Sequence, residues 1–244
     1  MYRDRVDAKL KAKSALKGNT WRLFFLILGV ELLGSLPSIV LGMVGSLTGI
    51  EEHFIYILLE MAVSGAAAIF ILPINCVLDA KFLALVRNEN DKNYSLLFYY
   101  RNKSAEEIIK AYLLSGLYIV LGFILFIIPG IILSIRYSMI GFVFADNPDI
   151  DYRSAMRRSK EITDGRKWDI FVFMISFIGW YLLAILTLGL VMIYVSPYYS
   201  ASFAALYDGY CPKEKPHNDG YGTYTGDPYY GNFSNNDPYG GRFN

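Results

Sequence analysis

Three ionisable residues, Glu31, Glu60 and Arg136, interrupt otherwise apolar stretches of the chain. A charge inside a membrane is expensive, so such residues usually pair with one another or serve the path of an ion or substrate. Counted from the expected helix ends at a rise of 1.5 Å per residue, Glu60 and Arg136 each lie about 9 Å deep and Glu31 about 15 Å deep. We therefore expect Glu60 and Arg136 to form an ion pair, with Glu31 bonded to a neighbouring helix. The alternative is that all three line a polar path through the membrane, which a continuous polar cavity reaching Glu31 would indicate.

Residue types that build catalytic or metal centres are few and scattered. The chain has two cysteines, Cys76 and Cys211, and two histidines, His53 and His217, none of them at the spacing of a metal site. It contains no G-x-S-x-G, Walker or H-E-x-x-H motif. We predict no catalytic residues, no metal and no cofactor, and we expect that the protein is not an enzyme. A net charge of +1 creates no field that would attract nucleic acid, so no nucleic-acid partner is expected.

The elements that position these residues are set by long uncharged runs. Apolar residues make up 54% of the chain and charged residues 18%, and the 38 residues from Ile170 to Tyr207 carry no charge at all. A single helix of that length would reach about 57 Å, nearly twice the thickness of a hydrocarbon core. The run must therefore fold back, and Thr187-Leu188-Gly189 is the best place for a turn. The second apolar run, from Ala111 to Ala145, carries only Arg136, and Pro129-Gly130 is its expected break.

The same reasoning predicts an all-α membrane bundle of six spans arranged in three hairpins. The expected spans are 21–47, 54–78, 108–128, 130–145, 168–187 and 190–207. Lys and Arg mark cytoplasmic loops, and here they gather in residues 1–22, 79–110 and 146–169 and after residue 208. Both termini are therefore expected in the cytoplasm. Residues 1–20 are predicted to be a basic amphipathic cytoplasmic segment without a signal peptide, and 21–208 the membrane domain.

A basic segment before the third hairpin has helical periodicity. One face is expected to carry Tyr152, Ala155, Met156, Ser159 and Ile162, and the other Arg153, Arg157, Arg158 and Lys160. Such a helix could lie in the membrane interface with its basic face toward anionic lipid head groups. The alternative, given equal weight, is a cytoplasmic helix packed on the bundle's own loops.

A short repeat marks two points where the chain enters the membrane. Residues 18–24 and 165–171 share the pattern G-x-x-W-x-[LI]-F. Glycine is expected to end the preceding helix, and Trp21 and Trp168 to anchor the chain at the interface, where an apolar ring with a polar N–H is favoured. Duplication of a helix-plus-hairpin unit is one hypothesis for the pattern, and chance similarity is the other.

The composition changes abruptly at residue 209. Residues 209–244 are rich in Gly, Tyr, Asn, Asp and Pro and contain an imperfect repeat at 227–233 and 237–243. Such a segment buries too little apolar area to offset the entropy of ordering, so it is predicted to be a disordered cytoplasmic tail. Its aromatic residues could contact a protein partner, or the tail could be solvated without a specific role.

The ordered landmarks of the chain resemble a bacterial membrane family, domain of unknown function 975 (DUF975). The resemblance covers about residues 5–208 and is carried by Ala15–Trp21, Ile127–Ile132, Arg136–Met139, Ala145–Asp149, Ser159-Lys160, Gly165–Trp168, Ser176–Leu183, Thr187–Gly189 and Pro197–Tyr199. It implies a multi-spanning protein of the bacterial cytoplasmic membrane. It implies no activity, cofactor or catalytic residue.

Together these features favour a non-enzymatic protein that organises lipids or partner proteins at the inner leaflet. The expected partners are membrane lipids with anionic head groups and, through the tail, another protein. The alternative function is a carrier of an ion or small substrate that uses Glu31 and the Glu60–Arg136 pair.

Overall fold

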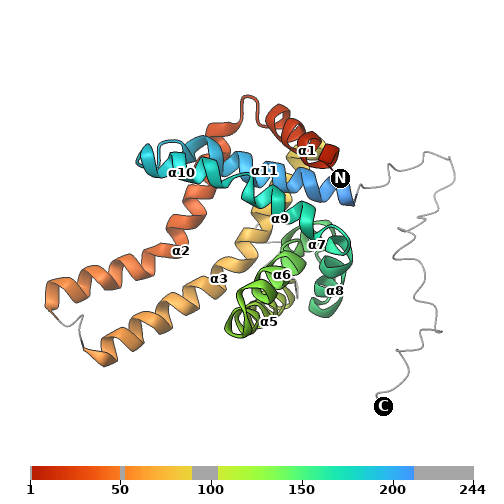
Figure 1. Cartoon of the computed structure of the whole chain (residues 1–244). Helices are drawn as coiled ribbons and strands as arrows, with labels where there is room; N and C mark the ends of the chain where they lie inside the picture. Colours follow the sequence, from red (N-terminus) through yellow and green to blue (C-terminus); the bar gives the residue numbers. More distant parts are fainter. Residues whose placement is uncertain (1, 50–52, 90–103, 212–244) are drawn as a thin grey trace, which may run out of the picture. The chain divides into compact units, whose positions relative to one another are not determined.

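The computed structural model describes residues 2–49, 53–89 and 104–211, in which every regular element is a helix and no strand occurs. This confirms the predicted all-α fold. The helices, shown in Figure 1, are α1 (Tyr2–Ala15), α2 (Thr20–Thr48), α3 (Phe54–Arg87), α5 (Ser104–Leu125), α6 (Ile127–Tyr137), α7 (Ile140–Asp146), α8 (Tyr152–Thr163), α9 (Lys167–Ile175), α10 (Ile178–Leu186) and α11 (Met192–Tyr210). The predicted disordered tail lies, from residue 212 onward, outside the described residues.

Long apolar helices show that this is a membrane protein. Within the described residues, five segments are long and apolar enough to cross a membrane, namely Thr20–Thr48, Phe54–Arg87, Ala105–Leu125, Ile127–Asp146 and Lys167–Leu186. The sixth predicted span corresponds to α11, which is not among them. All residues from Ala201 to Asp208 of α11 are buried by other parts of the protein. The count of six spans therefore stays a prediction.

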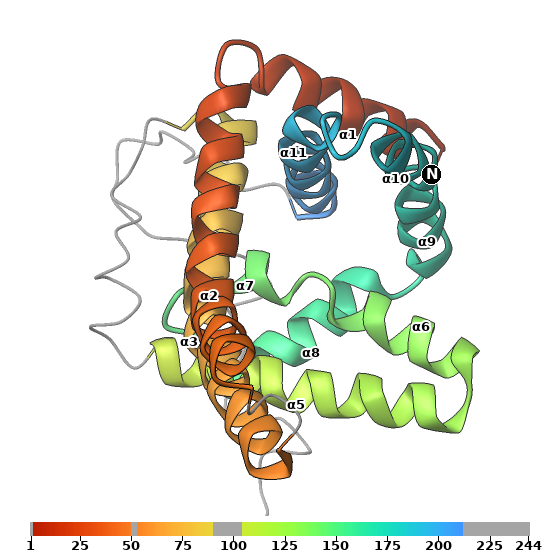
Figure 2. The same cartoon turned by 90° about the vertical axis from the view of Figure 1, so that its left-hand side faces the viewer.

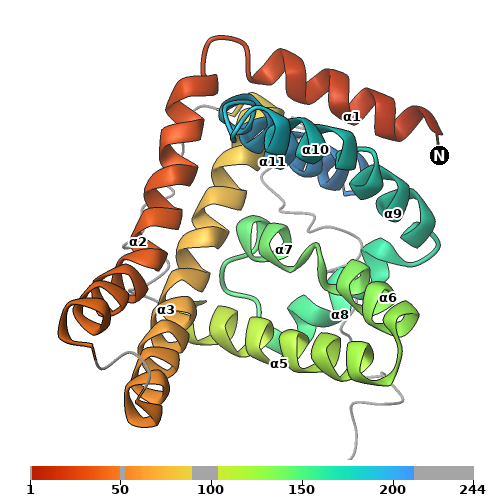
Figure 3. The ribbon, with the colours of Figure 1, turned by 60° about the vertical axis from the view of Figure 1, so that its left-hand side comes forward.

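The first predicted hairpin is formed by α2 and α3, which pack against each other (Figure 3). Helix α3 continues past the predicted span end at 78 as far as Arg87. The extension follows from packing, because Phe82 and Leu83 are 2% and 3% exposed and lie in the hydrophobic core. Burial by neighbouring helices thus prolongs α3 beyond Asp79, the first charged residue after the predicted span end.

The second predicted hairpin breaks at a different residue from the one expected. Helix α5 ends at Leu125, Phe126 is extended, and α6 begins at Ile127, so the predicted break at Pro129-Gly130 is wrong. Proline is tolerated in the first turn of a helix because the N–H groups there have no intrahelical partner. Gly130 instead serves the packing of α5 on α6, since a Cβ at this position would overlap the ring of Phe123.

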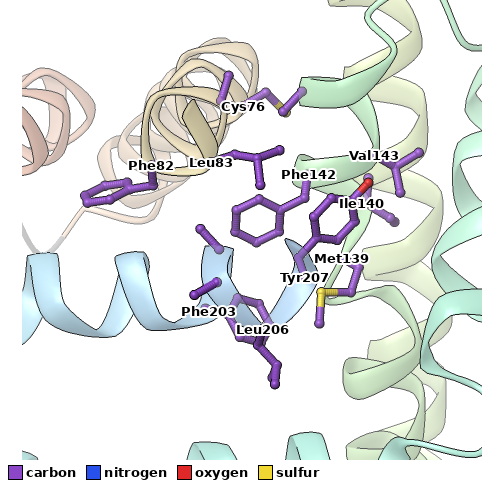
Figure 4. Packing of buried hydrophobic residues seen from close by; sticks show 14 of the residues in the cluster. Cys76, Phe82, Leu83, Met139, Ile140, Phe142, Val143, Phe203, Leu206 and Tyr207 are labelled. Carbon is purple, nitrogen blue, oxygen red and sulfur yellow. The ribbon is translucent and has the colours of Figure 1, made fainter. Parts of the chain in front are cut away.

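The fourth and fifth predicted spans are each formed by two short helices. The segment Ile127–Asp146 is broken between α6 and α7, and Lys167–Leu186 is broken between α9 and α10. Helix α7 is buried from Ile140 to Ala145 and packs against α3 and α8. Figure 4 shows its Phe142 between Leu83 of α3 and Tyr207 of α11. The Phe142 ring is stacked on that of Tyr207, with the ring centroids 5.2 Å apart.

The basic N-terminal segment forms α1, which packs along α11 (Figure 2). Its buried residues, Ala8, Ala12 and Leu16, are spaced four apart and therefore share one face. The Nζ of Lys9 donates a hydrogen bond to Ser176 Oγ at 2.7 Å and lies 4.7 Å from the centroid of the Phe177 ring. These contacts attach α1 to the bundle.

Candidate functional site

The ends of α3, α7 and α11 meet at a buried arginine. The side chain of Arg87 is 6% exposed, and its Nε donates to Asp208 Oδ1 at 2.6 Å. Its two terminal nitrogens donate to the two carboxylate oxygens of Asp146, at 2.5 and 3.2 Å. A guanidinium matches a carboxylate in this two-bond geometry, which is the strongest form of the contact. Arg87 therefore joins the last residue of α7 to the last turn of α11.

Two further donors complete this charge network of Arg87, Asp146, Asp208, Lys11 and Tyr207. The hydroxyl of Tyr207 donates to Asp146 Oδ2 at 2.9 Å. The Nζ of Lys11, from α1, donates to Asp208 Oδ2 at 2.6 Å. Two carboxylates thus face two cations, and four helices are held at one point. The arrangement is that of a structural clasp, because each carboxylate binds a cation within the protein.

Three charged residues of the network follow the ends of the predicted hairpins: Arg87 follows the first, Asp146 the second and Asp208 the third. The network was not predicted, because only charges inside the spans, and not those after their ends, were taken as candidates. A signal was present in the sequence. A Tyr-Ser pair at 137–138 precedes Asp146, and a second at 199–200 precedes Asp208, with nine residues from tyrosine to aspartate in both cases.

The network should make the protein sensitive to acid. Burial acts to raise the pKa of Asp208, but the hydrogen bonds from Lys11 and Arg87 outweigh it and hold that pKa below its ordinary value of 3.8. A lowered folded-state pKa stabilises the protein above the unfolded-state pKa, and this contribution is lost as the pH falls.

We expect Asp208→Asn to reduce the free energy of unfolding at pH 7 by about 2 kcal/mol, as for hydrogen bonds to charged groups. Denaturant titrations at pH 7 and below pH 4 measure the effect. The difference between the variant and the wild type should shrink at the lower pH. A difference that is the same at both pH values would contradict the assigned role of the Asp208 charge.

A second close contact involves the carboxylate of Asp79. It packs against Gly141 of α7 so closely that a Cβ at position 141 would overlap its Oδ2 and would lie 2.8 Å from the hydroxyl of Tyr112. The thiol of Cys76 lies one turn earlier on α3 and 3.9 Å from the same hydroxyl. Polar groups of α3 and α5 therefore surround a position of α7 that has no room for a side chain.

The three charges singled out from the sequence do not come together. Glu31 is exposed on α2, Glu60 is partly buried on α3, and Arg136 lies at the end of α6. Among the described residues, no ion pair joins Glu60 to Arg136, so the expected pair is not formed. An ion pair between Glu60 and Arg136 would require α3 and α6 to be neighbours. Instead α3 packs against α2, α7 and α11, whereas α6 packs against α5, α8 and α9.

A cavity of about 210 Å³ lies elsewhere, between α1 and α11. Its walls are formed by Asp7, Ala8, Lys11, Ala205, Leu206 and Gly209. None of the three charges singled out from the sequence lines it.

Helix α8 places one face in the bundle and the other outside it. The predicted face is buried at Ala155, Met156, Ser159 and Ile162, against α5, α6 and α7. Arg153 and Arg157 are exposed, whereas Arg158 and Lys160 are partly buried. Arg158 pairs with Glu161 at 3.7 Å, and the Nζ of Lys160 lies 5.2 Å from the centroid of the Tyr137 ring. The apolar face is thus taken up by the protein itself, and the basic face remains outward.

The two copies of the G-x-x-W pattern have the same backbone geometry. Gly18 and Gly165 have φ values of +89° and +70°, which glycine adopts without strain. The N–H of Asn19 donates to the carbonyl of Leu16 at 2.9 Å, and in the same position Arg166 donates to Thr163 at 3.1 Å. In both copies a basic helix ends at the glycine turn and a largely apolar helix follows.

The tryptophans of both copies point outward. Trp21 is 60% exposed and Trp168 is 73% exposed. Trp21 stacks on Phe25, with ring centroids 5.9 Å apart, and Trp168 packs on Phe171 at 5.5 Å. Exposed aromatic rings at the start of long apolar segments are typical of anchors at the membrane interface.

Comparisons with known proteins place the chain in a family without assigning it an activity. No curated protein and no solved structure matches it. The family model described as "Protein of unknown function (DUF975)" matches residues 50–210. This region contains Arg87, Asp146, Asp208 and Gly141, together with the whole of α8. The chain therefore belongs to the DUF975 family of membrane proteins.

Proposed function

We propose that this protein is a non-enzymatic component of the bacterial cytoplasmic membrane that gathers anionic lipids at the inner leaflet, with both termini in the cytoplasm. The observation that carries the proposal is an arrangement that occurs twice. A basic helix buries one face in the bundle, turns at a glycine of positive φ, and leads into an apolar helix that starts with an exposed tryptophan.

In the third hairpin this arrangement is formed by α8 and α9. Trp168 sets the level of the lipid head groups, because its ring is favoured at that depth. Helix α8 precedes it directly, so the exposed Arg153 and Arg157 lie on the aqueous side of that level. Basic side chains near an anionic membrane surface contribute about 1 kcal/mol each to its attraction. The basic face of α8 is therefore placed to attract anionic lipids to the protein.

The first hairpin repeats the arrangement with α1 and α2. Val6, Leu10 and Lys13 are exposed and, at their spacing, lie along one face of α1, and the exposed Lys17 follows in the turn after the helix. Leu10 is 60% exposed even though the opposite face of the helix is buried against α11. A face that mixes exposed apolar and basic residues suits the boundary between head groups and acyl chains. Two separate parts of the chain thus present the same chemistry.

The proposal predicts which lipids the protein retains. The wild type is reconstituted into vesicles of equal parts phosphatidylglycerol and phosphatidylcholine, extracted with its lipids, and examined by native mass spectrometry. We expect phosphatidylglycerol to be enriched, and the double variant Arg153→Glu with Arg157→Glu to lower that enrichment severalfold at low salt, from about 1 kcal/mol per charge.

The matched control is Arg153→Lys with Arg157→Lys, which keeps both charges and should retain the enrichment. Added salt should weaken the enrichment in the wild type, because exposed charges are screened. Equal binding of the two lipids by the wild type would overturn the proposal.

A further inference from the structure

The guanidinium of Arg136 is unusual because one of its nitrogens is buried without a hydrogen bond to any described residue. Its Nε is buried without a hydrogen-bond partner in the part of the chain that the structure describes. The backbone carbonyl of the same residue accepts a hydrogen bond from Ser159 Oγ of α8 at 2.8 Å. The backbone is thus fixed at the junction of α6 and α8, while the Nε of the side chain has no bond within the described residues. Buried polar groups without a partner are rare in proteins and often mark a bound molecule.

A second cation lies against the next residue of α6, Tyr137. Lys160, the residue after Ser159, places its Nζ 5.2 Å from the ring of Tyr137, the residue after Arg136. The charge of Arg136 also contributes to lowering the pKa of Asp164, whose main partner is Lys167 at 2.6 Å. Residues 158–169 carry four cations and three carboxylates, and Arg136 adds a fifth cation, so the junction carries a net positive charge.

An apolar track leads away from the junction along α6. Ile132 and Ile128 stand one and two turns before Arg136, and residues at a spacing of four share a helix face. They are 40% and 71% exposed. Helix α9 packs against α6, and its second residue, Trp168, is 73% exposed. A positive centre thus lies on the same helix face as exposed aliphatic side chains, and the helix that packs against α6 carries an exposed tryptophan.

We propose that Arg136 and Lys160 bind the phosphate of one anionic phospholipid, with an acyl chain lying along Ile132 and Ile128. This inference rests on the proposed lipid-gathering function and adds to it one discrete site. The planar fork of an arginine binds phosphate oxygens through parallel hydrogen bonds, and the lysine adds a point charge. Inorganic phosphate offers the same oxygens but nothing that would cover the isoleucines. A phospholipid contacts both parts of the site, the two cations through its phosphate and the isoleucines through an acyl chain.

The test is native mass spectrometry of the full-length protein with added phosphatidylglycerol, phosphatidylcholine or inorganic phosphate. At rising collision energy we expect one phosphatidylglycerol molecule to remain bound to the wild type after the others have left. Arg136→Gln should lose this last lipid, and Arg136→Lys should retain part of it. Arg22→Gln, which neutralises an exposed arginine of α2, should keep it.

The possible outcomes separate the site from the wider function. Equal loss of the last lipid in Arg136→Gln and Arg22→Gln would overturn the site and leave the general attraction of anionic lipids standing. Displacement of the last lipid by millimolar inorganic phosphate would assign the site to a free anion instead. A wild type that shows no preference for phosphatidylglycerol at all would overturn both proposals.

A measurement on the unmodified protein keeps the inference testable if Arg136→Gln does not fold. Phenylglyoxal modifies accessible arginines, and the modified peptides are identified by mass spectrometry. Phosphatidylglycerol, but not phosphatidylcholine, should protect Arg136 several times more strongly than it protects the exposed Arg22 of α2. Equal protection of the two arginines would count against a discrete site.

Discussion

Replacing Arg87 with methionine is expected to lower the free energy of unfolding by about 3–5 kcal/mol, the range for removing one partner from a buried ion pair. The side chain of Arg87 is 6% exposed, and it bonds both Asp146 and Asp208. Without it, two carboxylates remain at the meeting point of α3, α7 and α11, with Lys11 as the only other cation of the charge network. The stability is therefore lost mainly because negative charge is left uncompensated, and less because a contact is missing.

Unfolding of the purified variant by denaturant in detergent, followed by tryptophan fluorescence, measures this effect. Arg153→Met is the matched control, because Arg153 is exposed on α8 and should change stability by less than about 0.5 kcal/mol. Adding Asp146→Asn and Asp208→Asn to Arg87→Met should restore much of the lost stability, since removing all the charges is far less harmful than removing one. If the triple variant is less stable than Arg87→Met alone, the network is not the clasp described here.

The long apolar helices of this protein are largely predictable because the lengths of the apolar runs set most of their bounds. The predicted span 21–47 corresponds to α2, which runs from Thr20 to Thr48, since both ends are set by the lengths of apolar runs. The position of a break inside an apolar run is less predictable. Pro129 permits either a break or the first turn of a new helix, and the packing of Gly130 against Phe123 decides between them.

The residues that bond to each other could not be predicted in the same way. Depth along a helix, which suggested the pair Glu60 and Arg136, says nothing about which helices are neighbours. Arg87 and Asp208 are 121 positions apart in the sequence, and their contact depends on how three helix ends meet. The local pattern of α8 did predict its buried face, because helical periodicity is independent of the partner. Whether that face would meet lipid or protein depended again on the rest of the fold.

The packing of α3 on α7 predicts the second large effect, that of Gly141→Ala. The added methyl group would overlap the carboxylate of Asp79, and a Cβ there also lies 2.8 Å from the Tyr112 hydroxyl. Either α7 moves away from α3 or the carboxylate loses its place, so we expect a destabilisation of about 2–3 kcal/mol, near the upper range for overpacking. Denaturant titration measures it.

Gly116→Ala on α5 is the control for this substitution, because a Cβ at position 116 meets nothing within 4 Å. There the change should be neutral or stabilising by up to about 1 kcal/mol, the difference in helix propensity between the two residues. Combining Gly141→Ala with Asp79→Ala tests the cause directly, since the shorter side chain leaves room for the methyl group. The double variant should be more stable than the sum of the two single effects predicts, and simple additivity would show that Asp79 is not what the methyl group meets.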